Sequence, residues 1–259
     1  MDTDKRKELC YRFITGRGFE VGAGLLPSNF STIDEVIFVD KRNIDELEKL
    51  FGARPSYQVM NPAEARARYP NGLDFVMAHQ VLEHCSNPIE VLLTEWIPLV
   101  RDGGVLFYSI PSCNGSTEYR RIQTPLRHIV EDWLFDRGDA DFESREHILS
   151  FIANWTAAAP KDFWYAADTT VQGFCAQALV EITRTYQDLH WHTYTLEVAQ
   201  AITEIAFYAA RAGMAWVHLE ETESVLYLIA RRDSKEPVRH HPCFDEHRER
   251  LSGALAKLG

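Results

Sequence analysis

The sequence predicts an α/β protein with a Rossmann-like doubly wound sheet, mostly parallel and with a C-terminal antiparallel hairpin. Two observations support this prediction. Short apolar runs alternate with helical segments through the first 111 residues, and this alternation is typical of a parallel sheet with helices on both faces. Near the C-terminus, two further apolar runs are joined by a very short turn, which indicates an antiparallel pair.

Five strands are expected in the first half of the chain. They are the apolar runs "GFEVG" (18–22), "EVIFVD" (35–40), "SYQVM" (56–60), "LDFVMAH" (73–79) and "VLFYSIP" (105–111). Helical spacing of apolar residues is found over 4–16 and 44–52, and another helix is expected from Pro88 to the stretch "LVRDGG". The elements of this half therefore follow the order of a parallel sheet with crossover connections.

The regular alternation stops after residue 111. Residues 112–194 are rich in aromatic residues, His, Arg and Asp and contain no convincing strand, and an amphipathic helix then follows over 195–213. The strands "MAWVHLEET" and "VLYLIARR" complete the expected sheet. We therefore divide the chain into a core (1–111 and 195–232), an inserted segment or lid (112–194) and a polar C-terminal tail (233–259).

Charge and composition disfavour several classes of protein. The formal net charge of −11 argues against sequence-independent binding of nucleic acid, which relies on Lys and Arg to neutralise phosphates. The charged N-terminus lacks an apolar signal core, and no apolar run approaches the roughly 18 residues of a membrane span. The five cysteines are scattered without paired spacing. A reduced cytoplasmic enzyme with no membrane span is expected.

Glycines and acids mark the ends of the first two expected strands. Gly22 and Gly24 let the backbone turn sharply and approach a ligand, but residues 25–27 are Leu, Leu and Pro where a dinucleotide site would want a third glycine. A ligand that ends in an amino acid needs less room, and Glu20 could bind its ammonium group. Asp40 could accept two hydrogen bonds from a ribose diol. Each acid alone could equally be an ordinary residue at a strand end.

Several stretches together resemble class I S-adenosylmethionine-dependent methyltransferases. They are "EVGAG", "VIFVDKR", "DFVMAHQVLEH", "EWIPLVRDGGVLFYSIP" and the final hairpin, and they cover residues 18–111 and 195–231. The stretches "TPLRHIVEDW", "SREHILSF" and "LHWHTYTLE" are similar to a bacterial subgroup associated with surface glycans and sugar-containing metabolites. The resemblance implies methyl transfer from S-adenosyl-L-methionine to a hydroxyl of a sugar or glycan-like acceptor.

The resemblance also implies which residues surround this methyl donor. They are Glu20, Gly22, Gly24, Asp40, Lys41, Asn61 and His79. In this assignment Glu20 lies near the methionine ammonium group, Asp40 binds the ribose hydroxyls and Lys41 flanks the adenine. Asn61 stands where relatives often carry an acid beside the adenine amino group, so the sequence departs from the family pattern there. His79 would reach the sulfonium end through its backbone.

Transfer of a methyl group to a hydroxyl requires a group that removes a proton. Residues 112–194 supply many candidates, of which His147 is the first choice as general base, followed by His192 and His128. For each histidine, a local hydrogen bond or packing under the insertion is the alternative interpretation. The aromatic side chains of this segment could stack on a sugar, form the core of a lid or contribute to a homodimer contact.

Two histidine-rich stretches have spacings that a metal site could use. The stretch "HWH" at 190–192 would place both rings on one side of an extended segment, where Glu131 or Glu146 could complete a site for a divalent ion. The stretch "RHHPCFDEH" in the tail has a zinc-like spacing, but its polar surroundings favour a solvated tail. No metal is expected, because no short ligand pair elsewhere completes the "HWH" set.

Three other functions remain open at this point. One is N-methylation of an aminosugar or small amine, which needs no strong base. Another is a non-catalytic protein that binds the cofactor and a partner, although the glycine loop and Asp40 are intact. A nicotinamide-dependent oxidoreductase is disfavoured by the missing third glycine and by the terminal hairpin.

Overall fold

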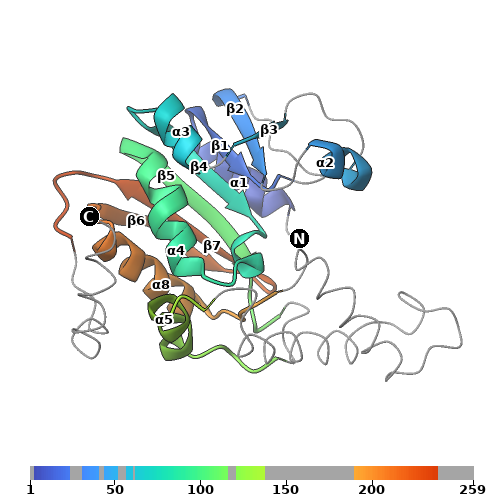
Figure 1. The fold of residues 1–259 in the computed structure, drawn as a ribbon, viewed down its shortest axis with the longest axis vertical. Coiled ribbons are helices and arrows are strands. Elements are labelled where there is room, and N and C mark those ends of the chain that lie inside the picture. The colour runs from blue at the N-terminus through green and yellow to red at the C-terminus, as the bar shows by residue number, and fades with distance from the viewer. Residues whose placement is uncertain are drawn as a thin grey trace, which may run out of the picture.

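The strands form one mixed sheet in the computed structural model, which describes residues 3–23, 31–40, 44–51, 57–60, 62–115, 121–137 and 190–238. Within these residues the sheet has seven strands in the order β3-β2-β1-β4-β5-β7-β6 (Figure 1). The strands are β1 (Gly16–Val21), β2 (Ile33–Asp40), β3 (Tyr57–Val59), β4 (Leu73–His79), β5 (Val100–Pro111), β6 (Met214–Glu221) and β7 (Val225–Arg232). Strands β1 to β5 are parallel, and β7 is antiparallel to both β5 and β6. The predicted fold class is confirmed.

Helices cover both faces of this sheet. The helical elements are α1 (Thr3–Phe13), α2 (Ile44–Phe51), α3 (Pro62–Arg68), η1 (Leu82–His84), α4 (Pro88–Val91), η2 (Leu92–Trp96), η3 (Ile97–Leu99), α5 (Leu126–Leu134) and α8 (Leu196–Ala209). Helix α1 packs on one face and α4 and α8 on the other (Figure 1). The described part of the chain is therefore a three-layer α/β/α arrangement.

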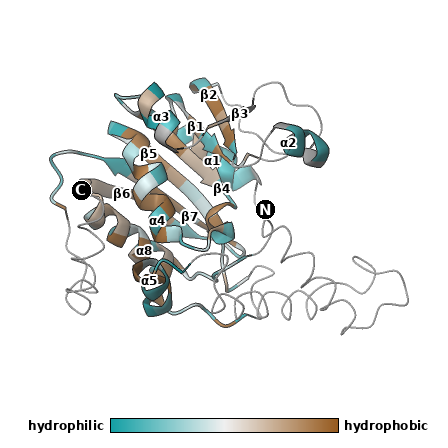
Figure 2. Cartoon of the chain, in the orientation of Figure 1, coloured by the Kyte–Doolittle hydropathy of each residue, from teal (hydrophilic) through white to brown (hydrophobic). Residues whose placement is uncertain are grey.

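Alternation of side chains along the strands explains the two apolar layers. In β4, Val76 and Ala78 belong to the core under α4 and α8, whereas Phe75 and Met77 belong to the core under α1. Strands β5 and β7 alternate in the same way, since successive side chains of a strand point to opposite faces. Figure 2 shows the corresponding hydrophobic colour along the strands of the sheet and on α8.

The helix expected from Pro88 ends earlier than the sequence predicts. It passes through a π-helical turn and a 3-10 turn and stops at Leu99, and β5 already begins at Val100 instead of residue 105. Pro98 has no backbone N–H to donate to the carbonyl four residues earlier. That carbonyl, of Thr94, accepts a hydrogen bond from the Arg66 guanidinium instead.

The two ends of the expected insertion lie side by side. The Cys113 amide donates to the Tyr194 carbonyl at 2.9 Å, and the Thr124 amide donates to the Thr193 carbonyl at 3.2 Å. Between them, α5, which was not among the expected elements, buries Ile129 in the core shared with α4 and α8. None of the helices within the described ranges is long and apolar enough to cross a membrane.

Candidate functional site

A tight turn at the carboxyl end of β1 forms the centre of the candidate site. Gly22 adopts φ +62°, a left-handed conformation that side chains disfavour, and its amide donates to the Val39 carbonyl at 2.8 Å. A Cβ atom on Gly22 would lie 2.7 Å from a methyl group of Val81. The turn therefore requires glycine for both its backbone angle and its space. Gly24 lies outside the described residues.

Asp40 is the last residue of the neighbouring strand β2 and is buried. Glu20 of β1 is aligned with Phe38 of β2 and with Met77 of β4. Because side chains two residues apart share a face, Asp40 and His79 lie on the same face as Glu20, which is the face that α1 covers. The structure thus brings four of the sequence-predicted residues, Glu20, Gly22, Asp40 and His79, to adjacent strand ends.

Glu20 has a partner that the sequence did not reveal. Its carboxylate accepts a hydrogen bond from the Arg6 guanidinium of α1 at 3.4 Å, and only 1% of the residue is exposed. A buried carboxylate needs such compensation for the water that it has lost. Cys10 lies near this pair, and burial raises the pKa of its thiol to about 12. Arg6 was not predicted as a partner of Glu20, because nothing in the sequence of the first helix distinguishes it from the neighbouring basic residues.

His79 is fixed in a buried position at the end of β4. Its Nδ1 lies 3.0 Å from the Ser109 hydroxyl, and its ring packs edge-on against Phe107 at 4.8 Å between centroids. Burial lowers the pKa of His79 well below 6.5, and the positive charge of Arg6 lowers it further. His79 is therefore neutral at pH 7. The next residue, Gln80, has φ +57°, and its amide donates to the Ser109 carbonyl at 2.8 Å.

Two of the three predicted base candidates meet around one carboxylate. His128 and Asp132, one turn apart on α5, lie 3.3 Å from each other, and His192 Nε2 lies 4.0 Å from the same carboxylate. The His192 Nε2 also lies 3.0 Å from the Ser86 carbonyl, and the residue is almost fully buried. This contact is a local hydrogen bond of the kind given above as the alternative to catalysis. His128 keeps about a third of its side chain exposed.

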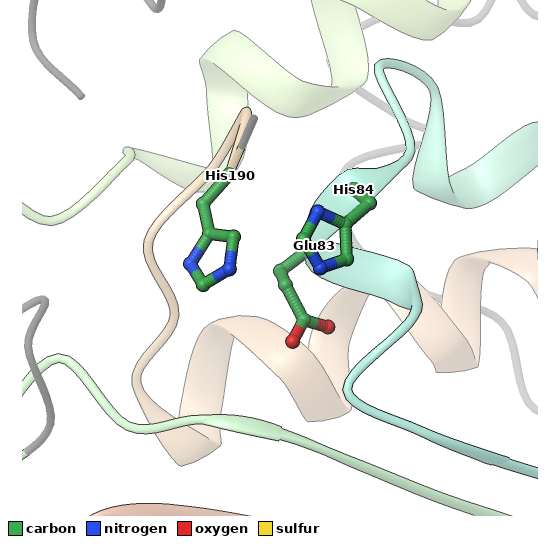
Figure 3. Close-up of side chains that lie close together, drawn as sticks. All are labelled: Glu83, His84 and His190. Atoms are coloured by element: carbon green, nitrogen blue, oxygen red, sulfur yellow. The ribbon is translucent and has the colours of Figure 1, made fainter. Parts of the chain in front are cut away.

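A second cluster lies on the turn that follows β4. Glu83 and His84 belong to η1, and His190 belongs to the extended segment before α8. Each residue offers a ligand atom, and these atoms all lie within 4.8 Å of one another. Figure 3 shows the His190 ring and the side chains of the Glu83–His84 turn facing each other across the two segments. The spacing of "HWH" is compatible with a metal site, but nothing in the sequence pairs this stretch with "LEH".

Several predicted residues lie outside the described part of the chain. They are Gly24, Lys41, Asn61 and His147. Their assigned roles remain predictions. In the sequence, Lys41 directly follows Asp40, the last residue of β2, and Asn61 comes two residues after Val59, the last residue of β3.

Comparisons with known proteins concern the fold. No family model and no curated protein matches the sequence. A candidate Zn-dependent alcohol dehydrogenase from Rhodobacter sphaeroides is 12% identical with a TM-score of 0.54, and the match covers 89% of both chains. An S-adenosylmethionine-dependent methyltransferase from Clostridium acetobutylicum is 9% identical with a TM-score of 0.45, covering 89% of this chain and 90% of that chain. DhpI in complex with SAH is 12% identical with a TM-score of 0.44, and the match covers 89% of this chain and 83% of that chain.

Proposed function

We propose that this protein is an S-adenosylmethionine-dependent methyltransferase that methylates a hydroxyl of a sugar or glycan-like acceptor. The observation that carries the proposal is the pairing of the left-handed turn at Gly22 with the buried carboxylate of Asp40 on the adjacent strand. In an open α/β sheet, an acid at the end of the second strand is placed to bind a ribose diol. The antiparallel β7 favours the methyltransferase arrangement over a dinucleotide fold, which normally repeats its parallel half.

The remaining donor contacts follow from the sequence resemblance. Gly22 and Gly24 would line the methionine and ribose parts, and Lys41 and Asn61 would flank the adenine. Glu20 is held by Arg6, so its negative charge is already partly neutralised. We therefore expect Glu20 to approach the ammonium group of the donor through water instead of replacing its ion pair with Arg6.

The chemistry expected at this edge is a direct displacement. The donor supplies a methyl group on a positively charged sulfur, and the chain must align the acceptor oxygen with that methyl and accept the hydroxyl proton. His147 remains the first proposed base, with His192 and His128 behind it. Of the latter two, His128 is the more exposed, and its Nε2 lies 3.3 Å from a carboxylate oxygen of Asp132.

An Asp40→Asn variant tests the donor site by calorimetry with S-adenosylmethionine. Asparagine keeps the shape and one acceptor oxygen but loses the charge. Since a hydrogen bond to a charged group contributes about 1.5–3 kcal/mol, the affinity should fall by roughly tenfold or more. Asp34→Asn is the matched control, because Asp34 lies exposed near the start of the same strand, and its affinity should match the wild type. Equal affinity of the Asp40 variant and the wild type would remove the ribose role of Asp40.

The acceptor can be tested by release of S-adenosylhomocysteine with a panel of sugar nucleotides, glycosides and aminosugars. Turnover with neutral sugars is expected. Turnover with aminosugars alone would instead support N-methylation. Donor binding without turnover across the panel would favour the non-catalytic alternative.

A further inference from the structure

The cluster of Glu83, His84 and His190 is built from two segments that the backbone holds together. The Trp191 amide donates to the Glu83 carbonyl at 2.8 Å, which fixes the residue after His190 against the η1 turn. Arg121 strengthens this connection, because its guanidinium donates to the carbonyls of His190 at 2.8 Å and Trp191 at 3.2 Å. The relative position of the three side chains is therefore set by backbone contacts and does not depend on the side chains alone.

The chemistry of the cluster is that of a transition-metal site. Two imidazoles and one carboxylate are a ligand set found in catalytic zinc sites and in non-haem iron sites, where they leave coordination positions open. Only 1% of Glu83 is exposed, whereas both histidines are half-buried. The buried carboxylate provides a charged ligand that is shielded from water. The two half-buried imidazoles leave a path by which an ion can enter from solvent.

The distances require only a small adjustment on binding. The candidate ligand atoms lie within 4.8 Å of one another. Two ligand atoms bound at about 2.1 Å to one tetrahedral ion lie roughly 3.4 Å apart. The His84 and His190 rings are 4.6 Å apart between centroids and nearly perpendicular. Side-chain rotations that move the ligand atoms by about 1 Å would bring all three atoms around one ion.

We propose that Glu83, His84 and His190 bind one divalent transition-metal ion. The metal binding itself is independent of the proposed function. Its role in catalysis rests on that function: the turn η1 begins three residues after His79, so an open coordination position would take the acceptor oxygen beside the donor. The metal-bound hydroxyl would lose its proton to a base, the resulting alkoxide would form the new O–CH₃ bond, and the donor sulfonium would become a neutral thioether.

Titration of the chelator-treated protein with Co²⁺ tests the site, because Co²⁺ bound to nitrogen and oxygen ligands gives visible d–d absorption. One equivalent should bind to the wild type and raise its Tm. His84→Ala and His190→Ala each remove a ligand. Since the loss of an outer-shell partner already costs about 10- to 100-fold in affinity, these variants should lose roughly 100-fold or more and should show no rise in Tm with the metal.

Two control variants separate this site from other histidines. His218→Ala removes a half-buried histidine of β6 whose Nε2 lies 2.7 Å from the Glu220 carboxylate, and it should bind Co²⁺ like the wild type. The double variant His240→Ala/His241→Ala removes the histidine pair of the tail and should also bind normally. The proposal is overturned by a wild type that binds no Co²⁺, by normal binding in the His84 and His190 variants, or by loss of binding only in the tail variant.

The methyl donor site is measured separately. Titration of the protein with S-adenosylmethionine in the presence of chelator reports the donor site alone. Donor binding without Co²⁺ binding would overturn the metal proposal and leave the proposed function intact. Co²⁺ binding without donor binding would support the metal site and contradict the proposed function.

Discussion

Burial changes the ionisation of individual side chains at the strand ends, and solution measurements can detect this change. His79 is the clearest example, because its ring is buried against Ser109 and Phe107 and it is the last residue of β4, the strand that pairs with β1 just before Gly22. Desolvation is the main cause of its lowered pKa, and Arg6 adds a smaller effect. The residue therefore acts as a neutral hydrogen-bonding group in the folded protein.

The pH dependence of stability follows from this lowered pKa. In the unfolded chain His79 binds a proton below about pH 6.5, whereas in the folded protein it does not. The unfolded state therefore gains protons first, and His79 makes the free energy of unfolding fall as the pH falls below about 6.5, by up to about 1.4 kcal/mol per pH unit. Denaturant unfolding of wild type and His79→Gln between about pH 7.5 and pH 5 should show curves that diverge below pH 6.5, with the steeper fall in the wild type. Parallel curves would contradict the buried neutral histidine.

The general base is the second prediction at this scale. With a hydroxyl acceptor, His147→Ala should lower kcat by about 10²- to 10⁴-fold, the usual contribution of general-base catalysis, and leave the Kd for S-adenosylmethionine unchanged. His128→Ala, measured alongside, should have the smaller effect on kcat. Unchanged turnover in the His147 variant, or a larger loss in the His128 variant, would move the role of base to α5.

The sequence predicted some of these residues and not others, for a physical reason. Gly22 and Asp40 could be singled out because a sharp turn after a strand calls for glycine, and the proposed ribose contact calls for an acid at the end of the next strand. Arg6 and the pairing of His190 with Glu83 could not be found. They depend on contacts between segments 14 and 107 residues apart, for which periodicity gives no signal.

At the scale of elements, the segment that leads into α8 positions the second histidine cluster. Arg121 anchors this segment through two carbonyls and is itself buried. Arg127 offers a matched comparison, since its side chain is mostly exposed and pairs with Glu131 one turn along α5. Arg121 connects two segments, whereas the pair formed by Arg127 and Glu131 stays within one helix.

Arg121→Ala should therefore destabilise the protein, and Arg127→Ala should not. Loss of the two charged hydrogen bonds to the carbonyls of His190 and Trp191 is expected to lower the free energy of unfolding by about 2–3 kcal/mol and to speed hydrogen exchange of the Trp191 amide. The exposed pair of Arg127 is worth at most about 0.5 kcal/mol. Denaturant unfolding and amide exchange of both variants check this. Equal stabilities would mean that the segment holds its position without Arg121.

The elements themselves were largely predictable from their patterns. The strand β4 begins and ends where its apolar run does, and the hairpin of β6 and β7 follows the predicted order. The early start of β5 was missed because its first residues, "VRDGG", are mainly polar and read as the end of a helix. Their backbone pairing is set by the neighbouring strand, since Val100 is aligned with Leu73 of β4.

At the scale of the whole molecule, the fold is compatible with several functions and does not identify one of them. Rossmann-like sheets serve many chemistries, so function must be argued from the site. The sheet order, the antiparallel β7 and the acid at the end of β2 together favour a methyl donor over a dinucleotide. We propose that residues 112–194 determine the choice of acceptor, and their "SREHILSF" stretch lies outside the described ranges.

The most direct measurement is calorimetric titration of the wild-type protein with S-adenosylmethionine and, under identical conditions, with NAD. The turn at Gly22 and the carboxylate of Asp40 should bind S-adenosylmethionine at one molecule per chain, and NAD should give no saturable heat. Tight binding of NAD without binding of S-adenosylmethionine would contradict the methyl donor site.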